Sequence, residues 1–312
     1  MKNDPGAMRT QNTGLPLCAV IVLYRRSLSE TVSFQTLQRA LRHANLGAAD
    51  FRLLVWDNSP EPQIMPAWHH AISYHHDSSN GGLVPAYNRA IEEGLAAGGE
   101  WLLLLDQDTQ MPEDYFSTFF EALSWTTLRT VSFVPRVRAG GKMVNPVGVV
   151  AGIVGLRPLD ERFQGIRDEE TLGINSAAFV RMSFLKELGG YSSRYRLDAV
   201  DLWFFAAAYA RGRNVYVLPA WIDHDLSIAN IKGIKIERWR SIMRAEREYY
   251  AHMRSRSAQL LMSALATTRA ASLLLSHHLP RHMLVSLAEA GRLALGALLR
   301  KRENEENTSS SP

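Results

Sequence analysis

The sequence predicts an α/β fold built on a mainly parallel sheet. Three apolar runs of strand length, residues 17–24, 51–56 and 101–105, contain almost no polar residues, which is typical of strands buried on both faces. Segments with apolar residues at helical spacing separate these runs. Alternation of this kind indicates a parallel sheet covered by helices on both faces.

Each further element follows from its own local pattern. The first helix is predicted over residues 31–44, because Phe34, Leu37 and Leu41 recur at helical spacing. The later elements are predicted, in chain order, as a short strand at 72–75, a helix at 84–97, a strand at 131–135, helices at 183–188 and 201–211, and a strand at 214–218. The topology of the Gly- and Val-rich stretch at 144–156 does not follow from its pattern.

Glycine marks the ends of two predicted helices. Gly189 and Gly212 stand just after the apolar periodicity stops, where glycine can adopt the left-handed conformation that closes a helix. The strand at 214–218 runs directly into Pro219. Because proline donates no ladder hydrogen bond, we expect this strand to end there.

The composition excludes several classes of protein. The chain has 312 residues, of which 46% are hydrophobic and 21% charged, so disordered and fibrous architectures are excluded. Its single cysteine, Cys18, allows neither an internal disulfide nor a zinc cluster built on thiolates, which fits a reducing compartment. Residues 1–14 lack the apolar core of a signal peptide, so we expect a chain that is not secreted.

Charge divides the chain unevenly. Of the 35 Lys and Arg residues, 14 fall in residues 230–302 against four acidic residues there, whereas the preceding part carries a small net negative charge. A basic segment on a nearly neutral body indicates an anionic partner, either a membrane surface or nucleic acid. We therefore expect a flexible leader at 1–16, a catalytic domain at 17–230, a basic amphipathic helical segment at 231–302 and a disordered tail at 303–312.

The basic segment is predicted to form three helices, at 235–254, 258–276 and 281–299. Arg269 interrupts one of them, and Glu289 and Arg292 interrupt another, so no transmembrane helix is expected. The last helix is amphipathic, with Met283, Leu287, Leu295 and Leu298 opposite its charged residues. This apolar stripe fits a helix in a membrane interface, but it equally fits a helix packed on the catalytic body.

Polar residues follow each of the three buried strands. Tyr24 and Arg25 follow the first strand, and Asp57 follows the second in the sequence Asp-Asn-Ser-Pro. Ligands of open parallel sheets bind beyond the carboxyl ends of the strands. Asp57 can accept hydrogen bonds from a nucleobase or a ribose, although the same four residues are also common as a turn.

Two carboxylates follow the third strand. Asp106 and Asp108 are two residues apart, and a divalent cation that binds both can also bind a diphosphate. Such a metal stabilises the charge that develops on a nucleoside diphosphate leaving group. Two acids after a strand are frequent in α/β proteins, so their position directly after Leu102 to Leu105 strengthens the interpretation.

Taken in order, several short motifs resemble glycosyltransferase family 2, in its rhamnosyltransferase-like branch. The motifs are Val20-Ile-Val-Leu-Tyr24, Val55-Trp-Asp-Asn-Ser59, Asn80-Gly-Gly-Leu-Val-Pro-Ala-Tyr-Asn88, Leu104-Leu-Asp-Gln-Asp108, Leu188-Gly-Gly-Tyr191, Leu197-Asp-Ala-Val-Asp201 and Trp221-Ile-Asp-His224. They cover about residues 17 to 230. The resemblance implies the GT-A fold and transfer of a sugar from a nucleotide-activated donor with inversion at the anomeric carbon.

The resemblance also implies a role for individual residues. Asp201 matches the general base that takes the acceptor proton, with Asp198 as a rival for part of that role. Asp108 matches the principal ligand of a divalent cation, Mn²⁺ or Mg²⁺, and His224 matches a His that closes the metal site. The residues implied in nucleotide-sugar binding are Tyr24, Asp57, Asn80, Gly81, Asn88 and Asp106, the last of which contacts either ribose or metal.

The chain departs from the family pattern at Trp203, where an acidic residue is frequent, and at Ala207, where a basic residue is common. These departures bear on the acceptor. By branch resemblance we expect dTDP-rhamnose as the donor, a saccharide or lipid-linked acceptor of a surface polysaccharide, and a cytoplasmic enzyme peripheral to the inner face of the cell membrane.

Two alternatives from other functional classes stay open. A sugar nucleotidyltransferase also uses acidic metal ligands on a parallel sheet, but it needs a Gly-rich, basic phosphate loop, and no glycine follows the first strand here. A non-catalytic protein with a degenerate transferase body, docked on a membrane by its basic segment, is the second. Nucleic acid is a weaker partner, because few aromatic residues interleave the basic ones.

Overall fold

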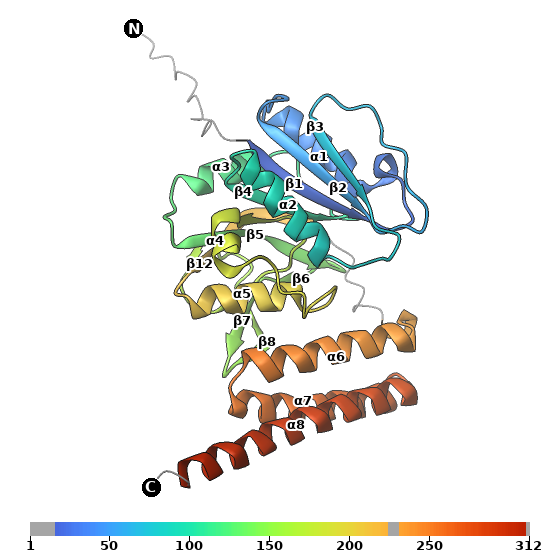
Figure 1. The fold of residues 1–312 in the computed structure, drawn as a ribbon, viewed down its shortest axis with the longest axis vertical. Helices are drawn as coiled ribbons and strands as arrows, with labels where there is room; N and C mark the ends of the chain where they lie inside the picture. The colour runs from blue at the N-terminus through green and yellow to red at the C-terminus, as the bar shows by residue number, and fades with distance from the viewer. Residues whose placement is uncertain (1–15, 224–230, 310–312) are drawn as a thin grey trace.

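A computed structural model describes residues 16–223 and 231–309 of the chain. It is an α/β structure with a mostly parallel central sheet and helices at the C-terminus (Figure 1), which confirms the predicted fold class. The leader residues 1–15 and residues 224–230 and 310–312 lie outside the described residues.

The predicted elements are present, with small changes in their bounds. The helices are α1 (Val32–His43), α2 (Val84–Ala96), α3 (Tyr115–Leu123), α4 (Met182–Leu188), α5 (Val200–Ala210), α6 (Ile236–Met253), α7 (Arg256–Leu275) and α8 (Pro280–Ser309), with 3-10 turns η1 (Leu28–Glu30) and η3 (Ile231–Gly233). The strands are β1 (Leu17–Leu23), β2 (Phe51–Asp57), β3 (Ala71–His76), β4 (Trp101–Asp106), β5 (Thr130–Ala139), β6 (Lys142–Asn145), β7 (Val147–Val150), β8 (Ile153–Pro158), β9 (Gly165–Arg167), β10 (Thr171–Leu172), β11 (Ala178–Arg181) and β12 (Asn214–Asp223).

The main sheet has the strand order β3-β2-β1-β4-β11-β5-β12-β9, with β6 paired to β5. Strands β3, β2, β1 and β4 are parallel, β11 runs antiparallel between β4 and β5, and β12 is parallel to β5. Because β11 reverses the direction twice, β5 and β12 run the same way as β4. Their carboxyl ends therefore lie at the same edge of the sheet as those of β1, β2 and β4.

Side chains of β1 alternate between two hydrophobic cores. Val20 and Val22 pack with α2, α4 and α5, whereas Ile21 and Leu23 pack with α1 and α3 on the other face. The only cysteine, Cys18, is buried beneath α2 and α4. Gly94 permits the close approach of α2 at this point, because a Cβ there would lie 3.2 Å from the Cys18 sulfur and nearer still to Met182.

Two predicted boundaries are wrong. Strand β12 continues through Pro219 to Asp223, because a register shift against β5 between Val217 and Trp221 removes the need for an amide donor at the proline. Helix α8 continues to Ser309, so residues 303–309 of the predicted disordered tail are helical. The three Glu residues of this stretch favour helix, and no glycine or proline interrupts it.

Helices α6, α7 and α8 stack beneath the sheet (Figure 1) and share a core with it. Tyr249, Tyr250 and Leu293 belong to the same hydrophobic cluster as β1, α2 and α5. An ion pair of 2.6 Å joins the largely buried Arg254 and Glu170. One hydrophobic cluster therefore continues across the predicted boundary near residue 230, and a further cluster around Trp239, Ile242 and Met243 lies within the C-terminal helices. We refer to α6–α8 as the helical module.

By length and composition, α7 and the described part of α8 could each cross a membrane. Of the most apolar part of each helix, 39% in α7 and 33% in α8 is buried in the structure. The charged residues that argued against a span are neutralised within the module, where Arg269 pairs with Glu246 at 2.6 Å and Glu289 pairs with Arg247 at 2.6 Å. The hydropathy and the exposed share of these two helices are therefore compatible with contact with lipid.

Candidate functional site

The carboxyl ends of β1, β2 and β4 bring together the polar clusters that the sequence indicated. Asp57 is in register with Leu23, and Val22 is in register with Asp106. Since neighbouring strands lie about 4.8 Å apart, Asp57 and Asp106 stand roughly 10 Å apart across β1. The backbone amide of Tyr24 donates to Gln107 Oε1 at 3.0 Å, and Tyr24 itself is 41% exposed at this edge.

Asp57 organises its own loop. Its carboxylate accepts hydrogen bonds from the amides of Ser59 (2.9 Å) and Gln63 (3.0 Å) and from the Tyr74 hydroxyl (2.7 Å), and the side chain is buried. Burial alone would raise its pKa, but these hydrogen bonds outweigh burial and lower it. The structure thus assigns Asp57 the turn-forming contacts that were its alternative interpretation, and nucleotide binding by Asp57 stays a prediction.

Helix α1 braces the turn that carries Asp106 and Asp108. The buried Ser33 hydroxyl donates to the carbonyl oxygen of Asp106 and accepts from the amide of Thr109 at 2.9 Å. One turn later, Thr36 Oγ1 accepts from the amide of Met111 at 3.3 Å. Side chains of α1 therefore hold the backbone at the end of β4, while the Asp108 side chain is exposed.

Asp106 and Asp108 are candidate ligands for a divalent cation. Asp106 accepts a hydrogen bond from the Ser176 hydroxyl. In residues 16–223 and 231–309, no three His, Cys, Asp or Glu side chains gather closely enough to hold an ion by themselves. Oxygen ligands from one or two carboxylates plus a substrate diphosphate are, however, a common environment for Mg²⁺. This pair therefore fits a cation that binds together with a nucleotide.

His224, the predicted second metal ligand, lies outside the described residues. The residue before it, Asp223, forms an isolated β-bridge with Gln110, two residues after Asp108. Arg138 holds Asp223 in place with two contacts of 3.2 Å. The chain thus reaches residue 223 alongside the turn that carries Asp108.

Asp201 has the electrostatics of a general base. It lies in the first turn of α5, and its carboxylate accepts a hydrogen bond of 2.8 Å from the amide of Leu202. Burial, together with the negative charges of Asp106 and Asp198, outweighs that hydrogen bond and raises its pKa from 3.8 to about 6. A carboxylate with this pKa accepts a proton far more readily than an exposed aspartate does.

Asp198 makes a different set of contacts. Both of its oxygens accept hydrogen bonds from the Arg238 guanidinium, one of them at 2.6 Å, and Ser241 Oγ donates to it at 3.0 Å. Both partners belong to α6. The geometry therefore favours Asp201 over Asp198 as the base, and it makes Asp198 the connection between the α5 loop and the helical module.

Buried polar atoms surround Asp201 and were not singled out by the sequence. Negative charge on Asp106 and Asp201 raises the pKa of the Tyr87 hydroxyl, after burial itself, so Tyr87 lies within reach of both. The Tyr87 hydroxyl interacts with the Asn175 side chain, whereas the Tyr191 hydroxyl is buried without a hydrogen-bond partner in the described part of the chain. Such an atom is rare in folded proteins, so the Tyr191 hydroxyl is a candidate contact for a polar ligand.

The Asn80–Gly82 turn supports the same loop from the α2 side. Asn80 has a positive φ of 52°, and the Gly81 amide donates to the Asp77 carboxylate at 2.9 Å. Gly82 has a φ of 93°, and any Cβ there would overlap the carbonyl oxygen of Arg196. The turn is thus packed directly against the segment that leads to Asp198 and Asp201.

Asn88 fastens α2 to the other end of that loop. Its side chain accepts a hydrogen bond from the amide of Tyr191 at 2.7 Å and donates to the carbonyl oxygen of Tyr191 at 3.1 Å. Both the oxygen and the NH₂ group of the Asn88 side chain are therefore hydrogen-bonded to backbone. In this structure Asn88 positions the loop, and its predicted contact with a sugar remains a prediction.

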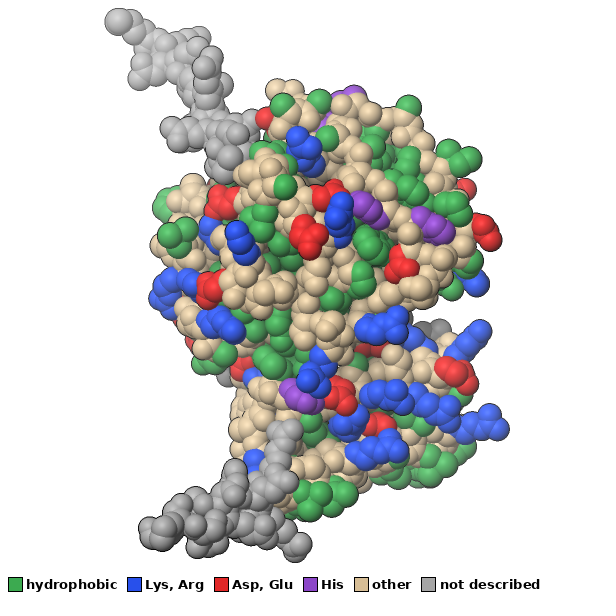
Figure 2. All heavy atoms as spheres, viewed as in Figure 1, with side chains coloured by type: hydrophobic (Ala, Val, Ile, Leu, Met, Phe, Trp, Pro, Cys, Tyr) green, Lys and Arg blue, Asp and Glu red, His purple; other side chains and the backbone are tan. Residues whose placement is uncertain are grey.

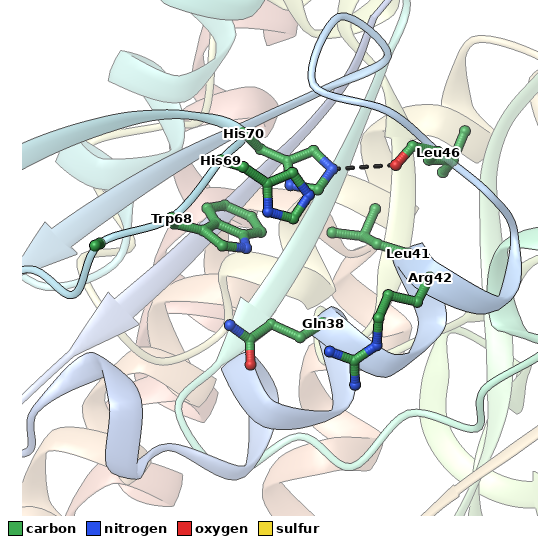
Figure 3. A pocket seen from close by; sticks show the side chains of 8 residues that line it. Gln38, Leu41, Arg42, Leu46, Trp68, His69 and His70 are labelled. Atoms are coloured by element: carbon green, nitrogen blue, oxygen red, sulfur yellow. Dashed lines mark hydrogen bonds between the residues drawn. The ribbon is translucent and has the colours of Figure 1, made fainter.

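A hollow of about 520 Å³ lies at the opposite edge of the sheet. Figure 3 shows its lining, where Trp68, His69 and His70 face Gln38 and Arg42 of α1, and His70 Nε2 lies 3.2 Å from the carbonyl oxygen of Leu46. These residues precede the amino ends of β2 and β3. The hollow is therefore separate from the carboxylates at the carboxyl edge.

Fold and site together define an α/β protein with a carboxylate cluster at the carboxyl edge of its sheet. No protein-family model matches the chain, and no curated protein matches it in sequence. Among solved structures it is similar to residues 1–349 of S. aureus TarS, with 12% identity, a TM-score of 0.48 and coverage of 87% of this chain and 90% of that chain. The TarS complex with UDP gives 13% identity, a TM-score of 0.46 and coverage of 93% and 92%, and the complex with UDP-GlcNAc gives 12%, 0.48, 87% and 90%.

Proposed function

We propose that this chain is an inverting glycosyltransferase of family 2 that transfers a sugar from a nucleotide sugar to a saccharide or lipid-linked acceptor. The observation that carries the proposal is Asp201, a carboxylate with a pKa of about 6, in electrostatic contact with the Asp106 turn at the carboxyl edge of a parallel sheet. The order of the sequence motifs from Val20 to His224 supports it.

In the proposed reaction, Asp201 takes the proton of an acceptor hydroxyl as its oxygen attacks the anomeric carbon of the donor. The bond from that carbon to the diphosphate oxygen breaks, and its electron pair leaves with the nucleoside diphosphate. Attack from the side opposite the leaving group inverts the anomeric configuration. We propose that the Tyr191 hydroxyl, which is buried without a hydrogen-bond partner in the described part of the chain, binds a polar group of the sugar or acceptor.

We further propose that Asp108, with Asp106 and His224, binds a divalent cation, Mn²⁺ or Mg²⁺, together with the donor diphosphate. When bound, this cation would stabilise negative charge on the leaving diphosphate. The bridge between Asp223 and Gln110, two residues after Asp108, supports the proposal, because it brings the chain to this turn at residue 223. We expect Asp108→Ala, or EDTA, to abolish transfer and metal-dependent nucleotide binding, whereas full activity in either case would remove the cation from the proposal.

For the donor we propose dTDP-rhamnose, and for the acceptor a lipid-linked saccharide of a surface polysaccharide at the inner face of the cell membrane. Trp203 and Ala207 of α5, which depart from the family pattern, bear on acceptor choice. Trp203 packs on Tyr191, with ring centroids 5.9 Å apart. We propose that this aromatic pair lines the acceptor side of the site, where it would favour the apolar face of a sugar ring over a charged acceptor.

The decisive experiment is a screen of the full chain against nucleotide sugars with Mn²⁺ or Mg²⁺, following thermal protection and slow donor hydrolysis. The panel includes dTDP-rhamnose and UDP-GlcNAc, the latter being the ligand of the TarS complex. Asp201→Asn should keep donor protection and lose hydrolysis, whereas Asp114→Asn, which changes an exposed carboxylate on α3, should keep both. Pyrophosphate release from a nucleoside triphosphate and a sugar phosphate would instead establish the nucleotidyltransferase alternative.

A further inference from the structure

A groove of about 590 Å³ lies between α6 and α8 of the helical module. Four arginines line it, Arg240 and Arg244 from α6 and Arg281 and Arg292 from α8, together with two acidic residues, Glu237 and Glu289. Figure 2 shows Lys and Arg side chains gathered over these helices, next to hydrophobic side chains at the lower edge of the molecule. The groove therefore combines positive charge with a neighbouring apolar surface.

Most of this charge has no internal partner. Glu289 pairs with Arg292 and with Arg247, whereas Arg240, Arg244 and Arg281 have no ion pair within the described ranges and are exposed. Arg240 and Arg244 are also four residues apart on one helix, where like charges repel each other. Three unpaired guanidinium groups converging on one groove are suited to phosphate, to which arginine donates two parallel hydrogen bonds.

An apolar stripe runs along α8 beside the arginines. Leu284, Leu295 and Leu298 are 60%, 58% and 50% exposed, because α8 packs on α6 and α7 through another face that contains Ser286, Ala290, Leu293 and Ala297. The buried face includes His282 and Glu289, two residues that the sequence pattern assigned to the solvated side. At 100° per residue, Arg281 and Arg292 fall next to Leu284 and Leu295 on the helix surface.

We propose that this surface binds an anionic phospholipid bilayer, with lipid phosphates in the α6–α8 groove and the α8 leucines among the acyl chains. Charge complementarity supports the bilayer as the occupant, and the adjacent leucine stripe supplies the apolar contact that a soluble phosphate would not need. These residues would carry the membrane association proposed above, whatever the catalytic role of Asp201.

The test uses the full chain and co-sedimentation with vesicles of phosphatidylglycerol and phosphatidylcholine. Combined Arg240→Gln, Arg244→Gln and Arg281→Gln should lower the vesicle partition coefficient by on the order of tenfold to a hundredfold. The matched control removes the same charge from the exposed Arg42, Arg52 and Arg162 of the catalytic body and should change it less than about threefold. Raising salt from about 0.1 M to about 0.5 M should release part of the wild-type chain but little more of the groove variant.

The apolar half of the proposal has its own pair of variants. Leu284→Ser with Leu295→Ser should lower binding at high salt, where the apolar contribution persists. Ile64→Ser with Leu128→Ser changes two side chains of the body that are 92% and 77% exposed and should leave binding unchanged. All four residues are exposed, so the melting temperature of each variant should match that of the wild type.

Several results would overturn the inference. Equal binding to neutral phosphatidylcholine vesicles, or equal losses in the groove variant and its control, would exclude a phosphate site. Retention after alkaline carbonate washing would mean that α7 and α8 span the bilayer. Tighter binding of a single-stranded RNA that is lost in the groove variant, or leucine-dependent self-association without vesicle binding, would assign the surface to nucleic acid or to a second copy of the chain. Because vesicle binding and donor hydrolysis are measured separately, failure of one leaves the other proposal standing.

Discussion

Asp201 is the residue whose environment most clearly departs from that of an ordinary aspartate. Burial and the nearby charges of Asp106 and Asp198 raise its pKa to about 6. If Asp201 takes the acceptor proton, only its ionised form is active. We therefore expect turnover at saturating donor to fall as the pH is lowered through about 6, with a slope of one proton, as measured by initial rates at constant ionic strength. A flat profile between pH 5 and pH 7 would contradict this role.

The same pKa shift means that ionised Asp201 lowers the free energy of unfolding at neutral pH. The folded pKa is raised above the unfolded value, so the stabilising effect of the proton is fully present below about pH 4 and is lost as the pH rises through about 6. Asp201→Asn should therefore lower turnover by on the order of 10² to 10⁴ while raising the free energy of unfolding at pH 7 by about 1 to 3 kcal/mol.

Chemical denaturation at pH 7 and at pH 4 checks the stability half of this prediction. The gain should be present at pH 7 and absent at pH 4, where the wild-type carboxyl is also protonated. An equal loss of stability at both values would mean that Asp201 is a structural residue. Such a result would remove the main support for its role as base.

Asp198→Asn should behave in the opposite way. The substitution weakens a two-point contact with Arg238 and leaves that guanidinium without a charged partner. We expect a loss of about 1 to 3 kcal/mol of stability and a smaller loss of turnover than Asp201→Asn causes. Thermal melting and initial rates measured on the two variants side by side make the comparison. If Asp198→Asn has the larger effect on turnover, the role of base moves to Asp198.

Helix α1 is the element that supports the proposed metal turn, and Ser33 makes the contact. Ser33→Ala removes the partner of the Thr109 amide and of the Asp106 carbonyl oxygen. We expect about 1 to 3 kcal/mol of lost stability and weaker metal-dependent nucleotide binding. Ser124→Ala, whose exposed hydroxyl donates only to Glu121 within the same helix, is the matched control. Calorimetric titration with nucleotide and Mn²⁺ would detect the difference, and equal affinities would show that the turn holds its shape without α1.

Elements with simple periodicity could be predicted from the sequence, and elements set by distant contacts could not. The apolar runs at β1 and β4 are buried on both faces, so their type follows from composition alone. Strand β11 has no such signal, because its antiparallel place between β4 and β5 is decided by both neighbours. The continuation of β12 past Pro219 depends on a shift in register against β5, and the local sequence carries no signal of that shift.

The candidate site divides in the same way. Asp57, Asp106 and Asp108 directly follow buried strands, so their common edge could be predicted from the parallel sheet. The ion pair of Asp198 with Arg238 joins residues 40 positions apart, and no local pattern indicates it. Tyr191 fits the apolar face of its segment, so only the structure distinguishes its buried hydroxyl without a partner from that of an ordinary core tyrosine.

At the scale of the whole molecule, the helical module is part of the folded body. Leu293 of α8 belongs to the same hydrophobic cluster as β1 and α2. Within the module, Trp239 Nε1 of α6 donates to the carbonyl oxygen of His282 at 3.2 Å and to Ser286 Oγ at 3.1 Å, both in α8. If α8 were only a membrane-interface helix, as one interpretation of the sequence has it, truncation before Arg281 would leave donor hydrolysis nearly unchanged. The structure leads us to expect instead a loss of on the order of 3 kcal/mol or more of stability, measured by thermal melting. A truncated chain that melts at the wild-type temperature would restore that interpretation.

The burial of Cys18 has a practical consequence for following this molecule at a membrane. Burial raises the pKa of its thiol to about 11, and the thiolate is the form that reacts with maleimides, so the native chain is in effect a background without a reactive thiol. A cysteine introduced by Leu295→Cys can therefore be labelled alone, with the natural cysteine left in place. A polarity-sensitive dye at that position would convert contact between α8 and lipid into a change of colour in real time.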